Sequence, residues 1–164
     1  MARPEEVTVT PSLLDRLIDM EPRQAEDSPA SRAQSVRRLR LAVRRDLEWL
    51  LNTRRNPDAA PDSMVELSQS VYNYGLPDFS AVSLNSPKDR DWLLIEVERT
   101  VALFEPRLRD IRVTLLETAG GSRTLRFQIE GLLDMDPAPE QVSFDTVLQL
   151  SSGEYQIRGE RGGT

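Results

Sequence analysis

Glu105-Pro106-Arg107 is the clearest candidate for a recognition site, because it sets a carboxylate and a guanidinium on either side of a proline. Proline fixes its own φ and removes a backbone donor, so the junction is expected to be stiff. In an extended backbone the side chains at i and i+2 point the same way, which would place Glu105, Arg107 and then Arg109 along one side. Such a display suits charge-complementary binding of a partner protein. An internal ion pair across the junction is the alternative, and the spacing alone favours that alternative.

The acidic side chains allow one catalytic hypothesis, glycoside hydrolysis, which needs two carboxyl groups about 5–9.5 Å apart. With 27 acidic residues in the chain, a pairing among the candidates is unspecific: Glu96, Glu98, Glu105, Glu117 and Glu130. The sequence has no Cys and no His, which excludes cysteine zinc sites, thiolate nucleophiles and Ser-His-Asp catalysis. It also lacks a Gly-rich phosphate loop, a paired-Asp calcium loop and a nucleophile elbow. We therefore expect no catalytic residue, no cofactor and no metal.

Arginine is the dominant cation of the chain, since the 21 basic residues include a single lysine, Lys88. Five arginines gather on one predicted helix: Arg37, Arg38, Arg40, Arg44 and Arg45. This stripe could bind an acidic partner, as in a regulatory binding module, but such a stripe is more often a solvated face with local partners such as Asp46 and Glu48. The formal net charge of −6 argues against general nucleic-acid binding.

The length of 164 residues suits one compact domain. No run of 18 apolar residues is present, and the N-terminus lacks the apolar core of a secretory signal, so we expect a cytoplasmic protein that does not insert into a membrane. The expected organisation is a short helix and flexible linker over residues 1–31, one α+β domain over 32–158 and a disordered tail over 159–164.

Apolar spacing predicts three helices, over residues 12–20, about 32–53 and 86–105. The first is marginal in isolation, so it must dock on the rest of the domain. The third begins with Ser86 as N-cap, Pro87 at the first helical position and Asp89 placed to complete a capping box. The expected buried faces are Val36, Leu39, Val43, Leu47 and Leu50 in the second helix, and Leu94, Val97, Val101 and Phe104 in the third.

After Pro106 the apolar residues alternate, which predicts strands near 111–115, 125–129, 142–150 and 155–158, with a hairpin turn over 118–122. Helices followed by strands indicate an α+β fold, with N-terminal helices packed on one face of a small, mainly antiparallel C-terminal sheet. The third and fourth strands are the expected edges at which a partner's strand could pair. A loop over 70–80 contains Tyr72, Tyr74 and Phe79, which we expect to anchor it to the domain.

Several segments, taken in order along the chain, carry a family resemblance. They are Pro11–Leu17, Arg44–Arg54, Ser70–Asp78, Phe104–Leu108, and Ile129–Leu133 with Phe144–Thr146. Together they resemble the TssE family, a baseplate subunit of the bacterial type VI secretion system. That family is similar to a wedge protein of contractile-phage baseplates that carries a lysozyme-like label. The resemblance runs over residues 11–158, nearly the whole chain.

The resemblance implies a non-enzymatic structural subunit in a cytoplasmic baseplate docked at the inner membrane. Its implied partners are the wedge proteins TssF, TssG and TssK, and it would provide a platform for the contractile TssB/TssC sheath. Glu105, Pro106 and Arg107 match the family's Glu-Pro-Arg motif, which is linked to holding the wedge core together, so the resemblance reverses the preference given by spacing. On this view Arg107→Ala should weaken assembly and leave stability nearly unchanged. The alternative function is a peptidoglycan-cleaving, lysozyme-like glycosidase with paired carboxylates.

Overall fold

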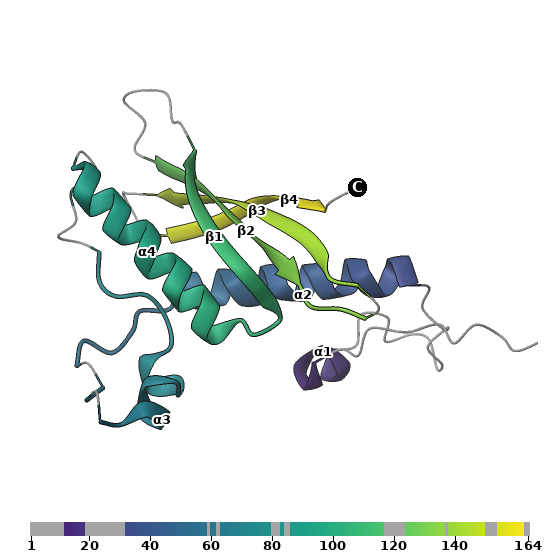
Figure 1. The fold of residues 1–164 in the computed structure, drawn as a ribbon, viewed down its shortest axis with the longest axis horizontal. Helices are drawn as coiled ribbons and strands as arrows, with labels where there is room; N and C mark the ends of the chain where they lie inside the picture. Colours follow the sequence, from purple (N-terminus) through teal and green to yellow (C-terminus); the bar gives the residue numbers. More distant parts are fainter. Residues whose placement is uncertain are drawn as a thin grey trace, which may run out of the picture.

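The chain folds into helices first and strands second. The computed structural model describes residues 12–18, 32–58, 60–61, 63–79, 83, 86–116, 124–136, 138–149 and 154–162. Its elements are α1 (Leu13–Leu17), α2 (Arg32–Asn52), α3 (Val65–Ser68), the 3-10 helix η1 (Val71–Asn73), α4 (Pro87–Phe104), β1 (Leu108–Leu116), β2 (Thr124–Leu133), β3 (Glu140–Gln149) and β4 (Glu154–Gly162). The predicted α+β class is confirmed (Figure 1).

The four strands form one antiparallel sheet in the order β1-β2-β3-β4. Helices α2 and α4 lie against one face of it, as the sequence predicted (Figure 1). The expectation that the third strand is an edge is wrong, because β3 pairs with β2 on one side and with β4 on the other. The two outer strands are β1 and β4.

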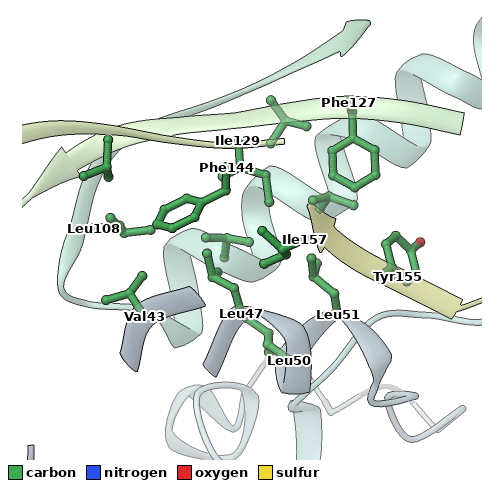
Figure 2. Close-up of a cluster of buried hydrophobic side chains, with 14 of the residues drawn as sticks. Val43, Leu47, Leu50, Leu51, Leu108, Phe127, Ile129, Phe144, Tyr155 and Ile157 are labelled. Atoms are coloured by element: carbon green, nitrogen blue, oxygen red, sulfur yellow. The ribbon is translucent and has the colours of Figure 1, made fainter. Parts of the chain in front are cut away.

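The core lies between the sheet and the two long helices. Phe127, Ile129 and Phe144 of the sheet point toward Leu47 and its neighbours on α2 (Figure 2). The predicted buried face of α2 is confirmed: Leu39, Val43, Leu47 and Leu50 are buried, and Val36 packs against them half-buried. On α4 the buried residues are Leu93, Val97, Thr100 and Val101, while Leu94 and Phe104 are partly buried, so the helix is rotated slightly from the predicted face.

Helix α4 begins and ends where the sequence places it. Ser86 is the N-cap, its Oγ accepts from the Asp89 amide at 3.3 Å, and Pro87 takes the first helical position. The expected capping box does not close on Ser86, because the Asp89 carboxylate accepts from the Ser83 amide at 3.1 Å. The helix ends at Phe104, because Pro106 disfavours the α conformation at the residue before it.

Strand β1 contains a bulge at Asp110, the only described non-glycine residue with a positive φ, at 51°. Arg109 pairs with Leu132 and Arg112 with Glu130, so β1 carries one extra residue between these pairs. Leu108 is buried before the bulge and Val113 after it. Gly131 lies opposite, and a Cβ there would stand 3.1 Å from the Arg109 carbonyl oxygen.

Strand β4 runs further than expected, to Gly162 rather than Arg158. Its pairing with β3 continues through a bulge at Asp145/Thr146 as far as Val142 opposite Gly162. Residues 159–162 therefore lie in the sheet and not in a tail. The predicted linker over 21–31 and the hairpin turn over 118–122 lie outside the described residues.

Two of the three aromatic residues expected to anchor the loop, Tyr74 and Phe79, pack against α4. Tyr74 packs edge-to-face on Phe104 with ring centroids 5.3 Å apart, and Phe79 packs in the same way on Trp92 at 5.5 Å. Between them, Leu76 donates its amide to the Thr53 carbonyl at 2.8 Å. Gly75 makes this approach possible, since its φ is +102° and a Cβ there would lie 2.3 Å from that carbonyl oxygen.

Gly75→Ala is expected to lower the free energy of unfolding by about 2 kcal/mol or more, because a side chain meets both a left-handed backbone and a fixed carbonyl. Urea unfolding would measure the loss. Gly159→Ala is the matched control: its Cβ would meet the end of the Asp145 side chain at 3.2 Å instead of a backbone carbonyl, so a smaller loss is expected. Equal losses at the two positions would contradict the argument for Gly75.

Candidate functional site

The candidate site is built on a tight turn that joins α4 to β1. The Leu108 amide donates to the Glu105 carbonyl at 3.1 Å, which makes Glu105 to Leu108 a four-residue turn. Pro106 occupies its second position, where a fixed φ suits a turn. The Arg107 carbonyl accepts from the Asp134 amide at 2.8 Å. The backbone that carries the Glu-Pro-Arg triplet is therefore held from both sides.

Glu105 and Arg107 form an internal, two-pronged ion pair. Arg107 donates from Nε to Glu105 Oε1 at 2.6 Å and from Nη2 to Oε2 at 2.5 Å. Glu105 is 3% exposed, so its carboxylate has lost nearly all contact with water. A buried charge of this kind requires a paired and hydrogen-bonded partner. Arg107 meets that requirement.

Three further charged residues extend this pair across the surface. Arg107 Nη2 also donates to Asp46 Oδ2 at 2.6 Å. Asp46 Oδ1 accepts from Arg45 at 2.7 Å, and Arg45 Nη2 donates to Asp15 Oδ1 at 2.8 Å. Cations and anions alternate along this row. We call Asp15, Arg45, Asp46, Glu105 and Arg107 the charge cluster; it joins α1, α2 and the turn after α4.

The charge cluster shifts the pKa values of Arg107 and Asp15 and of a neighbouring tyrosine. Burial alone would lower the pKa of Arg107, but hydrogen bonds and charges of Glu105 and Asp46 raise it above the ordinary value. Partial burial would raise the pKa of Asp15, whereas hydrogen bonds from Ser12 and Arg45 and the nearby guanidinium charges lower it overall. Burial, together with the charges of Asp46 and Glu105, raises the pKa of the adjacent Tyr74 phenol.

Helix α1 docks by charge rather than by its apolar stripe. The sequence predicts that it must dock, and Asp15 makes that contact through Arg45. None of its residues is buried: Leu13 and Leu17 are 73% and 74% exposed. Ser12 caps the helix by accepting from the Asp15 amide at 3.1 Å.

An open hollow of about 610 Å³ lies where α1, α2 and the end of α4 meet. Its apolar wall consists of Leu14, Leu39, Trp49, Leu50, Tyr74 and Phe104. Ser12, Asp46 and the Glu-Pro-Arg triplet complete the lining. Nη1 of Arg107 is buried without a hydrogen-bond partner among the described residues, and Asp15 Oδ2 lies 3.9 Å from it. Arg45 stacks on the Trp49 ring, 5.1 Å from its centroid.

The structure gives each predicted site residue a distinct place. Glu105 is buried, Pro106 is exposed and Arg107 is half-buried, so the internal ion pair left open by the spacing is present in this chain. Asp15 and Asp46 complete the cluster. The sequence predicted Asp46 only as a local partner of the arginine stripe. No sequence spacing could link it to Arg107, which lies 61 positions further along the chain.

The arginine stripe on α2 has mostly internal partners. Arg40 forms an ion pair with Glu140 of β3. Arg44 donates to the Ile157 carbonyl at 2.6 Å, and Arg45 belongs to the charge cluster. Arg37 and Arg38 are exposed. The local partners Asp46 and Glu48 therefore account for only part of the stripe, because Arg40 and Arg44 also bind residues of the sheet.

The carboxylates proposed for glycoside hydrolysis do not converge on a site. Glu96 binds Arg55 at 3.3 Å, and Glu98 accepts from the Val113 amide at 3.1 Å. Glu130 lies on the sheet face away from the helices, because its neighbours Ile129 and Gly131 face the core. Glu117 lies outside the described residues. The glycosidase alternative thus has no structural support.

The described part of the chain has neither a metal-binding cluster nor a membrane-spanning helix. No group of three or more Asp or Glu side chains there could hold a metal ion. No helix there is both long and apolar enough to cross a membrane.

The internal contacts change the expected effect of Arg107→Ala, which should now destabilise the fold by about 3–5 kcal/mol, because it leaves Glu105 buried and unpaired. Arg109→Ala is the matched control two residues away, since its ion pair with Asp134 is exposed to water and should contribute little to stability. Chemical denaturation of both variants measures the difference. Similar stability of the two would contradict the structural importance of the Glu105–Arg107 pair.

Docking of α1 is expected to depend on pH and on salt. Because the folded pKa of Asp15 is lowered, its ion pairs stabilise docking above the ordinary value of 3.8 and are lost as the pH falls below it. Amide exchange at Arg16 and Ile18, whose amides close the helix, should accelerate at low pH and high salt, after correction for the intrinsic exchange rate. Asp15→Asn should show that loss at neutral pH. Equal corrected protection in Asp15→Asn and the unmodified chain would rule out the charge-based docking.

Comparison with known proteins places these features in a family. No curated protein matches the chain significantly. The family model for baseplate wedge protein gp25 matches residues 37–138, which is more than half of the 164 residues. The matched region begins within α2, includes the Glu-Pro-Arg turn and β2, and ends just before β3. The chain belongs to the baseplate wedge protein gp25 family, a family of structural baseplate proteins.

Proposed function

We propose that this chain is the TssE-type subunit of a type VI secretion baseplate, where it binds other wedge proteins and provides a platform for the contractile sheath. The observation that carries the proposal is the family match, which includes the charged turn. The proposed wedge partners are TssF, TssG and TssK, and the proposed sheath proteins are TssB and TssC. The proposed location is the cytoplasm, in a baseplate docked at the inner membrane.

Within the Glu-Pro-Arg triplet we assign different roles to the three residues. Glu105 is almost fully buried, so it acts as a positioning residue that fixes the Arg107 guanidinium. Pro106 is exposed at the tip of the turn, and Arg107 keeps 24% of its side chain exposed. A partner would therefore meet the proline ring and the exposed part of the Arg107 side chain. The pre-ordered turn reduces the entropy that is lost on binding.

For the sheath platform, the outer strand β4 is the candidate element. An antiparallel sheet can extend only at its edges, and β3 is an inner strand. Val147→Pro, a substitution that could be considered as a test of strand pairing, lies in β3. It would therefore disrupt the sheet itself and would not test whether a sheet edge binds the sheath. Changes meant to probe sheath binding belong in β4.

An affinity pull-down of the tagged chain from its native cell, analysed by mass spectrometry, tests the proposal. The other wedge proteins and the sheath should co-purify with the unmodified chain. Arg107→Lys keeps a positive charge beside Glu105 but loses the planar fork of the guanidinium, so the variant should remain folded. The amount of wedge protein that co-purifies with it should fall by a factor of about five or more, as expected for the loss of a charge-assisted hydrogen bond. Arg109→Lys, on the exposed pair, is the control and should recover normal amounts.

The possible failures separate the two parts of the proposal. Recovery of the unmodified chain alone would contradict the baseplate function. Normal recovery with Arg107→Lys, confirmed as folded by its thermal transition, would contradict only the assignment of the turn as the contact.

A further inference from the structure

Helix α4 packs on the sheet with one face, so its opposite face points outward (Figure 1). Ile95 lies at the centre of this outer face and is 63% exposed. Asp91 lies one helical turn before it and Arg99 one turn after it, and both are exposed. Because residues four apart are neighbours on a helix, these side chains form a row of an acid, an apolar group and a base. We call Asp91, Ile95 and Arg99 the outer row of α4.

The two charges of the outer row are unpaired. Within the described part of the chain, neither the Asp91 carboxylate nor the Arg99 guanidinium makes a hydrogen bond or an ion pair. The acidic residues nearest to Arg99 in α4 are Glu96 and Glu98, and they already bind an arginine at 3.3 Å and an amide of β1 at 3.1 Å, respectively. Eight residues, about 12 Å along the axis, separate Asp91 from Arg99.

An apolar flank runs beside the outer row. Trp92 and Leu103 are 42% and 40% exposed, and the Trp92 ring packs edge-to-face on Phe79. Single exposed apolar side chains are common on protein surfaces. Here Trp92, Leu103 and Ile95 lie on one side of one helix, together with two unpaired charges. This face therefore offers both an apolar contact area and charges that can select a partner.

The outer row is complementary to a second copy of itself. Two identical helices can pack antiparallel about a two-fold axis, so that each residue meets its symmetric counterpart across the centre. With Ile95 on the axis, Asp91 of each copy faces Arg99 of the other, because both lie four residues from the centre. Both charges are then paired. A parallel arrangement would instead set Asp91 against Asp91 and Arg99 against Arg99, which is unfavourable.

We propose that the outer row of α4 is a self-association surface, through which two copies of the free chain form an antiparallel, two-fold symmetric dimer. The two Ile95 side chains form its centre, two Asp91–Arg99 ion pairs lie on either side, and Trp92 and Leu103 cover the flank. One pair of helices buries less area than a standard interface of about 1,600 Å², so the dimer is weak and forms at high protein concentration. This inference concerns the isolated chain and does not rest on the proposed function.

Sedimentation velocity of the full chain over a wide range of concentrations tests the dimer. The average mass should rise toward that of a dimer as the concentration increases. Arg99→Glu should weaken association about ten-fold or more, because two ion pairs become two like-charge contacts, and Asp91→Arg should do the same. An equimolar mixture of these two variants should associate like the unmodified chain, since opposite charges face each other again. Arg38→Glu makes the same change of net charge at an exposed position of α2 and is the control, which should associate normally.

Disulfide trapping tests the two-fold axis, because the chain has no cysteine of its own. Packed helices lie about 8–10 Å apart and their Cα atoms about 2.3 Å from each axis, so two facing Cα atoms come within about 3.4–5.4 Å, which overlaps the disulfide range. Ile95→Cys should therefore give a covalent dimer under mild oxidation, and adding Arg99→Glu should greatly reduce its yield. Lys88→Cys is the matched control on the same face. Its two copies would lie about 21 Å apart along the axis, so they should not cross-link.

Three results would overturn the proposal. The first is a chain that stays monomeric at every concentration and gives no dimer with Ile95→Cys. The second is equal cross-linking by Lys88→Cys and Ile95→Cys, which indicates random collision or a parallel pairing. The third is failure of the mixed Arg99→Glu and Asp91→Arg variants to associate, with both shown to be folded by their thermal transitions. Because no baseplate protein takes part, these outcomes are independent of the pull-down.

Discussion

A carboxylate buried at the end of α4 is the constraint on which the charged surface shared by α1, α2 and the turn after α4 depends. Glu105 sits at the C-terminal end of a helix, where the carbonyl groups already create a negative potential. Its ionised form can be buried there only with a cation held against it, and Arg107 is that cation. Arg107 in turn fixes Asp46 on α2, and from there the alternating charges reach α1. The relative positions of three helix segments thus follow from one buried charge.

Helix α2 serves a different part of the structure with each of its faces. Leu39, Val43, Leu47 and Leu50 supply the core, while Arg44, Glu48 and Asn52 bind the β4 backbone. Arg45, Asp46 and Trp49 carry the charges and the aromatic surface beside α1. Little of its length is left free of contacts. Because α2 makes these different contacts, few of its residues can be substituted without affecting either the sheet or the charged turn.

The sequence predicted most of the elements, because their signals are local. Apolar periodicity located α2, α4 and the strands, and the Ser86–Pro87 and Pro106 signals located both ends of α4. The details that failed depend on contacts between distant residues. Asp89 binds Ser83 in place of Ser86, and β4 continues past Arg158 because β3 offers it a partner.

The candidate site shows the same division between local and distant information. The Glu-Pro-Arg triplet stands out in the sequence because its residues are adjacent. Spacing could not decide whether its charges bind each other or a partner, since that depends on burial. Asp15 and Asp46 were out of reach, because Asp15 lies 31 residues before Asp46 and Asp46 lies 59 residues before Glu105 in the sequence. Only the tertiary fold brings them together.

The bulge at Asp110 has a consequence for how insertions and deletions would act on this protein. Before it, the even-numbered Leu108 faces the core; after it, the odd-numbered Val113 does. The extra residue therefore changes which alternate residues of β1 face the core, between the charged turn and the rest of the strand. Removing one residue here would make the number of residues equal on β1 and β2 between these pairs, so that the bulge disappears while Leu108 and Val113 both keep facing the core. One further residue without a second bulge would instead turn the apolar side chains of the remaining strand toward water.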